Sequence, residues 1–175
     1  ADGKLGPADP RLGAVMGMRS LYCEGSVRIL LDGAAAHATV TVADKGVTMQ
    51  KAKKTEDQAI LVKGKKGDNP DGYDVVLSGA EVTNSLRAIY LDDSCTLDAV
   101  GLSLDSLHLM SNTKGDVKLR GTYKAGFIQQ KKPNVIDAYW IDSDWLSLES
   151  YAGRMMLSGV ADKVRVHAMG VAFVA

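Results

Sequence analysis

Residues 107–126 are LHLMSNTKGDVKLRGTYKAG, residues 127–145 are FIQQKKPNVIDAYWIDSDW, and residues 146–163 are LSLESYAGRMMLSGVADK. Each of these segments opens with a short alternation of apolar and polar residues that is typical of a β-strand. The same kind of opening occurs at Leu86, Leu107, Phe127, Leu146 and Val164, at separations of 21, 20, 19 and 18 residues. Similarity at a period of about 20 residues indicates a repeat architecture.

A second short strand is expected about ten residues after most of these openings. These second strands are expected at Val117-Lys-Leu119, Ile136-Asp-Ala138, Met155-Met-Leu157 and Val171-Ala-Phe173. A unit of this size cannot bury its apolar side alone, so we expect the units to stack as coils of a parallel β-helix, about 4.8 Å apart. An antiparallel sandwich of hairpins is the alternative.

The register of the repeats favours the β-helix over the sandwich. By spacing, Leu107, Phe127, Leu146 and Val164 are expected to occupy equivalent positions, as are Leu109, Leu148 and Val166. Hairpins require no such in-phase identity. Glycines stand at comparable intervals and are expected at tight corners, with Trp140 at the position where one glycine is missing; they are Gly79, Gly101, Gly121 and Gly159.

The first 74 residues are less regular. Residues 1–13 are rich in glycine and proline and are predicted to be a flexible arm, and residues 14–74 are predicted to form a leading β-segment before the coils of 75–175. Strands are expected over 19–31, 38–42, 47–50 and 60–62, with a turn at Asp32-Gly33. The strongest helix candidate is 12–21, which its glycines weaken.

Composition limits the class of protein. The chain has 175 residues, enough for one ordinary domain, with 46% hydrophobic and 24% charged residues. Its 21 basic residues balance its 21 acidic ones, so the net charge of +0 argues against a nucleic-acid partner and is compatible with self-association. No apolar run approaches the roughly 18 residues of a transmembrane segment.

The N-terminus and the cysteines bear on the compartment. The chain begins with Ala1 and a polar run, as expected of a mature protein whose signal peptide has been removed, so we expect it in the periplasm, on the outer membrane surface or secreted. Cys23 and Cys95 lie 72 positions apart. In an oxidising compartment they can pair, and two separate buried thiols are an equal alternative.

Residues 75–175 resemble the putative autotransporter adhesin family that is built around the head-GIN domain. The sequence segments that carry the resemblance recur at the spacing of the coils; they are Ser111–Leu119, Ala138–Leu148 and Leu157–Val164. The resemblance implies an all-β, right-handed parallel β-helix with a leading N-terminal β-sheet segment, exported to the cell envelope or surface. It implies no reaction. The chain differs from commoner members in lacking serial Ser-Gly-Ser-Gly corners.

The sharpest candidate for a binding site is the stretch 139–145. Asp142 and Asp144 are two apart and so share one face of a strand, between Tyr139-Trp140 and Trp145. Aromatic faces beside carboxylates can hold a sugar ring, so this stretch is interpreted as a glycan-binding platform. The alternative is that the rings fill the interior of the coil or cover an edge while the aspartates cap a turn.

Other chemistry is not supported by the pattern. Asp92-Asp93 alternate across a strand, the Asp-rich loop 68–74 lacks the spacing of a calcium site, and the three histidines are not spaced as zinc ligands. We therefore expect no catalytic residue, no metal and no cofactor. The basic groups near 51–54, 63–66 and 131–132 are interpreted as solvated turns.

The last strand supplies the second candidate surface. It runs to the end of the given sequence and leaves the final coil uncovered, so an interface with a second copy or a partner is expected through Val164, Val166, Val171 and Phe173. The function predicted is that of a noncatalytic, exported, adhesin-like or ligand-binding protein whose partner is a glycan or an envelope protein. A structural subunit of a larger envelope assembly, such as a secretion complex, is the alternative, and a carbohydrate-active enzyme ranks last.

Overall fold

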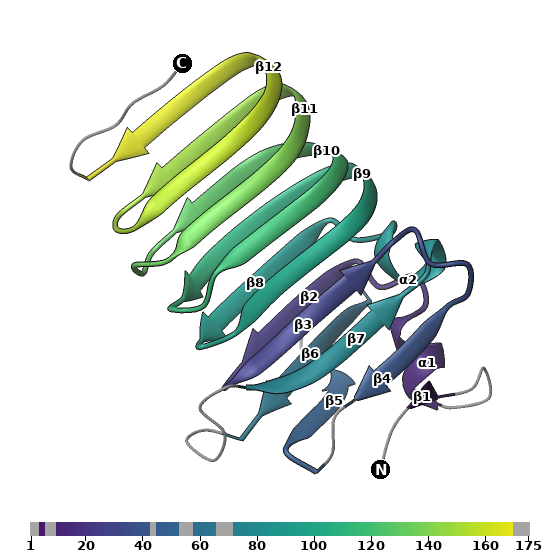
Figure 1. The fold of residues 1–175 in the computed structure, drawn as a ribbon. Coiled ribbons are helices and arrows are strands. Elements are labelled where there is room, and N and C mark those ends of the chain that lie inside the picture. Colours follow the sequence, from purple (N-terminus) through teal and green to yellow (C-terminus); the bar gives the residue numbers. More distant parts are fainter. Residues whose placement is uncertain (1–3, 6–9, 43–44, 53–57, 66–71, 170–175) are drawn as a thin grey trace.

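The structure, a computed structural model, describes residues 4–5, 10–42, 45–52, 58–65 and 72–169. The fold is all-β, since these residues form one twelve-stranded sheet with two short helices (Figure 1). The helices are α1 (Pro10–Val15) and α2 (Ala80–Thr83). The strands are β1 (Lys4–Leu5), β2 (Ser20–Glu24), β3 (Val27–Asp32), β4 (Thr39–Val42), β5 (Val47–Lys51), β6 (Ala59–Gly64), β7 (Tyr73–Ser78), β8 (Ala88–Asp93), β9 (Thr96–Thr113), β10 (Val117–Gln130), β11 (Val135–Ser150) and β12 (Arg154–Ala168).

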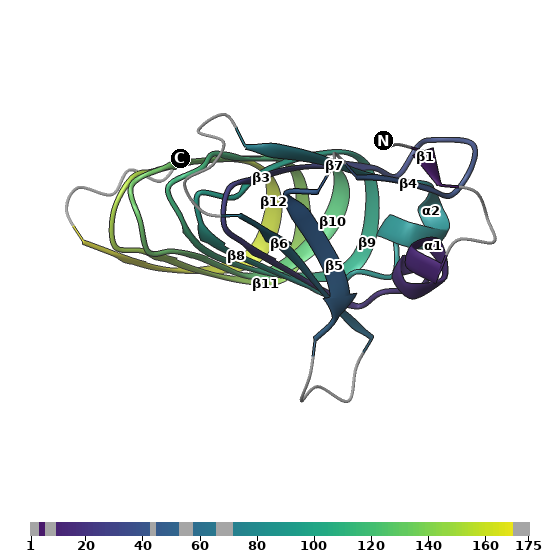
Figure 2. The same ribbon diagram turned by 90° about the horizontal axis from the view of Figure 1, so that it is seen from below.

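The long strands β9 to β12 pair in parallel, each with the next along the chain. Val117 pairs with Leu97 and Ile136, and Ile136 pairs with Met155, so the register advances by 20, 19 and 19 residues. The strands predicted to begin at Val117, Ile136 and Met155 therefore lie in register, while Val171 and Phe173 lie outside the described residues. The four strands stack side by side in Figure 1, and Figure 2 shows that the sheet curls nearly closed around one interior.

The buried faces of these strands form continuous columns. Leu109, Ile128, Leu148 and Val166 are joined by direct register pairs, which confirms the predicted equivalence of Leu109, Leu148 and Val166. The prediction for Phe127 was wrong: it pairs with His108 and Ser147, and Ala125 pairs with Leu107. Two register shifts on either side of Ala125 move Phe127 to the outer face, where its ring meets that of His108 at 6.3 Å.

Parallel pairing extends into the predicted leading segment. The region expected to be one strand over 19–31 is divided at Gly25 into β2 and β3, which pair with different neighbours: β2 lies between β6 and β8, and β3 between β7 and β9. Gly25 has a φ of 81°, and a Cβ there would collide with the carbonyl of Gly64. Glycine is therefore required where the chain turns the corner between the two strands.

In the described sheet, every antiparallel pair involves β1, β4 or β5. β5 pairs antiparallel with β6, as the strands predicted over 47–50 and 60–62 suggest, and β4 pairs antiparallel with β7 and β1. Helix α1 covers residues 12–15 of the helix candidate and also includes residues 10–13, which were predicted to belong to the arm. Leu12 is buried in the core, so this part of the arm packs against the sheet.

A disulfide joins the leading segment to the long strands. Cys23 in β2 is bonded to Cys95, which immediately precedes β9. The sequence separation is 72 residues, and both residues are fully buried. Of the two alternatives that the sequence left open, the structure has the bonded pair.

A buried polar cluster lies where β10 ends and β11 begins. The amide nitrogen of Gln130 donates to the carbonyl oxygens of Asn134 and Arg154, at 3.0 Å each, and to Asn134 Oδ1 at 2.7 Å. Its amide oxygen accepts from the Ser150 hydroxyl at 2.7 Å. Asn134 in turn donates to Ser111 Oγ and to the Gly115 carbonyl, so one cluster ties together turns from three successive strands.

Candidate functional site

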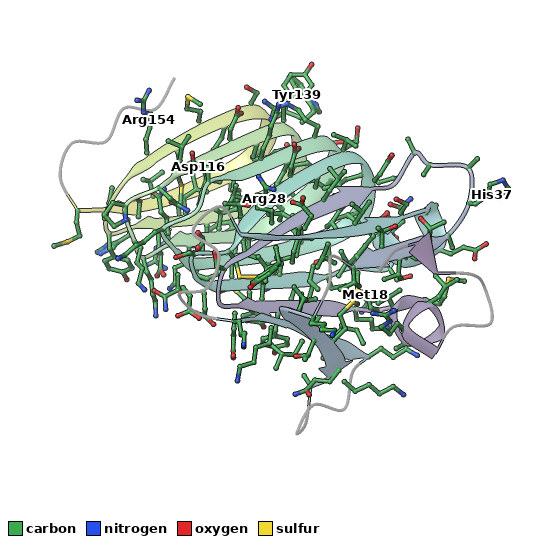
Figure 3. All side chains as sticks on the ribbon, turned by 60° about the horizontal axis from the view of Figure 1, so that its bottom comes forward. Met18, Arg28, His37, Asp116, Tyr139 and Arg154 are labelled. Carbon is green, nitrogen blue, oxygen red and sulfur yellow. A yellow bond between two sulfur atoms is a disulfide. The ribbon has the colours of Figure 1, made fainter. Side chains whose placement is uncertain are left out.

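The aromatic side chains predicted to form a platform lie on the outer face of β11. Tyr139, Trp140 and Trp145 are 50%, 37% and 52% exposed. Figure 3 shows Tyr139 projecting away from the ribbon. The alternative interpretation, in which these rings fill the interior, does not hold.

Two irregularities in β11 explain why these rings face outward. Tyr139 pairs with Ser158 of β12 and Ile141 with Gly159, so Trp140 is an extra residue with no counterpart on β12. Against β10, the register is also shifted between Ile141 and Ser147. Because a bulge inserts an unpaired residue and redirects side chains, exposed neighbours occur at 139–140 and again at 144–145.

The two carboxylates lie on the same exposed side of the strand, as their spacing predicts. Asp142 and Asp144 are both exposed, and Ser143 between them points inward, where its hydroxyl donates to the Ala125 carbonyl at 2.7 Å. Because successive residues of a strand point to opposite faces, both aspartates point outward. Among the described residues, neither carboxylate forms an ion pair or accepts a side-chain hydrogen bond, so both are available to a ligand.

An ion pair stands at the Tyr139 end of the site. Arg120 pairs in register with Tyr139, and its Nη2 lies 2.7 Å from Asp137 Oδ2. The hydrogen bond that Arg120 donates to the Asp137 carboxylate raises the pKa of the Arg120 guanidinium, which stays charged. The Tyr139 and Trp140 rings meet edge to face at 5.3 Å, so this end of the site is organised before any ligand arrives.

Neighbouring residues of β12 complete the surface. Val160, which is exposed, pairs with Asp142, and Lys163 pairs with Trp145. A Cβ on Gly159 would collide with the backbone of Ile141, so β12 approaches β11 closely beside Trp140. The site thus combines three rings, two unpaired carboxylates and one lysine. We call these residues, Tyr139, Trp140, Asp142, Asp144, Trp145 and Lys163, the β11 face.

Two of the four residues predicted for an interface, Val164 and Val166, are on β12. Val164 and Val166 are 47% and 41% exposed although they continue buried columns of the core. Val171 and Phe173, the other two residues of that prediction, lie outside the described residues. The β11 face adjoins the exposed edge of β12, because its Lys163 lies on that strand, but it does not include Val164 or Val166.

Two further surfaces were not predicted from the sequence. A shallow hollow of about 200 Å³ lies beside α1 and is lined by Arg11, Ala14, Met49, Gln50, Lys51 and Ile60. It is smaller than the 300–1,000 Å³ typical of ligand pockets. On the outer face of β2 and β8, Tyr22 and Tyr90 stack at 4.3 Å. Their pairing depends on strands 68 residues apart in sequence, which no local pattern indicates.

In the part of the chain that the structure describes, no three His, Cys, Asp or Glu side chains are grouped so as to hold a metal ion. No helix within the same residues has the length and apolar character needed to cross a membrane.

No protein-family model matches the chain, and a comparison with curated proteins finds no match. Among solved structures, the chain is similar to a protein described as a putative adhesin from Bacteroides fragilis, at 11% identity and a TM-score of 0.38, over 87% of this chain and 92% of the other. A putative adhesin from Parabacteroides merdae shares 10% identity with a TM-score of 0.42, over 97% and 96%. A protein described as a putative lipid binding protein from Parabacteroides distasonis shares 12% identity with a TM-score of 0.32, over 98% and 94%. Likeness at this level does not assign the chain to a family.

Proposed function

We propose that this protein is an exported, noncatalytic surface protein that binds a glycan through the β11 face. The observation that carries the proposal is the exposure of three aromatic rings beside two unpaired carboxylates on one strand. Leaving a ring such as Trp145 half exposed forgoes about 2–3 kcal/mol of apolar burial. A ligand that stacks on the rings would recover part of that free energy.

A sugar is the ligand class that suits this chemistry best. The apolar faces of pyranose rings pack against aromatic side chains, and their hydroxyls donate to carboxylates. Asp142 and Asp144 supply acceptors, and Lys163 beside Trp145 supplies a donor. The combination is therefore equipped for both the faces and the edges of a sugar ring.

The role is proposed as binding without turnover because of where the carboxylates lie. General acid–base catalysis requires a pocket that excludes water and shifts the pKa of the catalytic group. Asp142 and Asp144 stand instead on the outer face of a curved sheet, open to solvent. This placement favours recognition over hydrolysis.

For the fold, we propose a right-handed parallel β-helix of the head-GIN kind, adhesin-like in role. The parallel register of β9 to β12, with steps of about 20 residues, supports stacked coils. The sequence segments that carry the head-GIN resemblance include Leu119, Ala138 and Leu157, which pair with one another in successive strands. Export is supported by the Cys23–Cys95 disulfide, since disulfides persist mainly in oxidising compartments.

The test is a glycan array probed with the wild-type chain and with Trp145→Ala. We expect glycans retained by the wild type to bind Trp145→Ala at least about tenfold more weakly, which corresponds to roughly 1.4 kcal/mol. Tyr151→Ala is the matched control, because Tyr151 is also an exposed aromatic residue but lies in the turn after β11. Thermal unfolding of each variant should match that of the wild type.

Two results would count against the proposal. One is a wild-type chain that binds no glycan on the array. The other is a loss of binding in Tyr151→Ala as large as that in Trp145→Ala, since a specific platform predicts a difference between them. If the protein released shortened sugars from a bound glycan and Asp142→Asn abolished that release, the site would be catalytic and the proposed role of binding without turnover would be wrong.

A further inference from the structure

Within the part of the chain that the structure describes, the core is uncovered on the far side of β12. Along one buried column, Leu109 and Ile128 are fully buried, Leu148 is partly buried and Val166 is 41% exposed. The neighbouring column ends in the same way, from Leu146, which is buried, to Val164, which is 47% exposed. The exposure of these valines therefore comes from the end of the stack and not from an outward direction of their side chains.

The backbone of β12 is uncovered as well. Among the described strands, β12 pairs only with β11, so one edge of a 15-residue strand meets no partner. The opposite end of the sheet differs: its edge strands are the short β1 and β5, both paired antiparallel to their neighbours, with α1 in contact with β4 and β5. Short edges and a covering helix are the usual protection against edge-to-edge pairing, and β12 has neither.

We propose that β12 pairs with β12 of a second copy of this chain about a two-fold axis. The two uncovered interiors then close on each other and form one continuous core. A head-to-tail arrangement would instead place β12 against the protected end with β1, β5 and α1, which offers no open interior. The proposal does not depend on the ligand proposed for the β11 face.

The sequence of β12 is complementary to itself in this arrangement. Strand β12 curls back on itself, so its first half can lie antiparallel on the second half of the other copy (Figure 1). When Leu157 faces Val166 of the second copy, large inward residues meet smaller ones on both sides of that pair, which suits a packed core. The inward pairs are Leu157 with Val166, Met155 with Ala168, and Gly159 with Val164.

The charges of β12 fit the same register. The outward pairs are Arg154 with Met169, Met156 with His167, Ser158 with Arg165, and Val160 with Lys163. No cation opposes another cation in these pairs, so association needs no like-charge contact. The chain as a whole has a net charge of +0, which leaves no long-range repulsion between two copies.

The test is sedimentation velocity of the full chain over a wide concentration range. We expect a reversible dimer for the wild type and a dissociation constant roughly 100-fold higher for Val166→Asp, because the new carboxylate would be buried without a partner. Val166 is already partly exposed in one chain, so the variant should fold, and circular dichroism and thermal unfolding check this. Amide hydrogen exchange across 154–168 should slow as the wild type dimerises.

Val160→Asp is the matched control. Val160 lies on the same strand and is exposed, but it points outward and faces Lys163 of the second copy in the proposed register. This variant should dimerise like the wild type. A wild type that stays monomeric at all concentrations overturns the proposal, as does a dimer that Val166→Asp leaves intact. A different envelope protein bound along β12 in place of the second copy overturns it too.

Discussion

Replacement of Gln130 by leucine should destabilise the protein far more than the same change at Gln129. Gln130 is fully buried, and the two hydrogens of its amide nitrogen are shared among three oxygens of Asn134 and Arg154, while its amide oxygen accepts from Ser150. Gln129 points outward and makes one hydrogen bond, to Glu149 at 2.8 Å. The two positions are adjacent on β10, so the pair isolates the effect of the buried cluster.

The magnitude follows from the groups that lose a partner. Leucine is shorter than glutamine and donates nothing, so Asn134 Oδ1 and two backbone carbonyls lose their donor. Ser150 keeps one partner, the Ala152 carbonyl at 3.3 Å. At about 1 kcal/mol for each lost hydrogen bond, the free energy of unfolding should fall by about 3 kcal/mol. For a chain of this length, that corresponds to a decrease in Tm of about 6–12 °C.

The assay is urea and thermal unfolding of both variants, followed by circular dichroism. The Gln129→Leu variant should stay within about 0.5 kcal/mol of the wild type, as is usual for surface substitutions. If Gln130→Leu were no less stable than Gln129→Leu, the buried cluster would not contribute as its geometry implies. Gln130→Glu adds a pH readout, because its carboxylate would face three acceptor oxygens. Its pKa should rise in the folded state, so its stability should fall as pH increases above about 4.3.

Three more predictions concern the fold. Gly121→Ala should lower the free energy of unfolding by about 2–4 kcal/mol, since Gly121 has a φ of 138° and a Cβ would collide with the backbone of Leu102. Gly126→Ala should be tolerated, because its Cβ would meet only the side chain of His108, and the urea midpoints of the two variants test the difference. Removing the disulfide in the Cys23→Ala/Cys95→Ala variant should cost about 4 kcal/mol for a closed loop of 72 residues, and equal midpoints with and without the bond would contradict this. Burial raises the pKa of the Tyr123 phenol, so the contribution of this group to stability is fully present below pH 10 and is lost as pH rises further. The free energy of unfolding of Tyr123→Phe should therefore fall less steeply above pH 10 than that of the wild type.

Much of the repeated half could be predicted from the sequence because its signals are local. Alternation within a strand places successive side chains on opposite faces, so Leu109, Leu148 and Val166 were correctly placed in one column. Phe127 was misplaced because the register shifts around Ala125 depend on contact with β9. A shift of one residue moves a side chain to the other face of the sheet, and the spacing of residues within β10 does not predict where such a shift occurs.

In the candidate site, too, local features could be predicted from the sequence and features that arise between strands could not. The residue types and the two-residue spacing of Asp142 and Asp144 predicted a shared face, which the structure has. Whether Trp140 and Trp145 fill the core or face solvent could not be predicted, because the irregularities that turn them outward arise between strands. The buried cluster around Gln130 was not foreseen, since its members come together only when three strands stack.

By itself, the sequence determined an all-β chain with a period of about 20 residues, because strand alternation and glycine corners are properties of short segments. Only the tertiary structure decided the pairing of Cys23 with Cys95, the parallel pairing of the leading strands and the exposure of the β11 face. These features join residues far apart along the chain. They follow from which strands lie side by side and from where a bulge shifts the register between them.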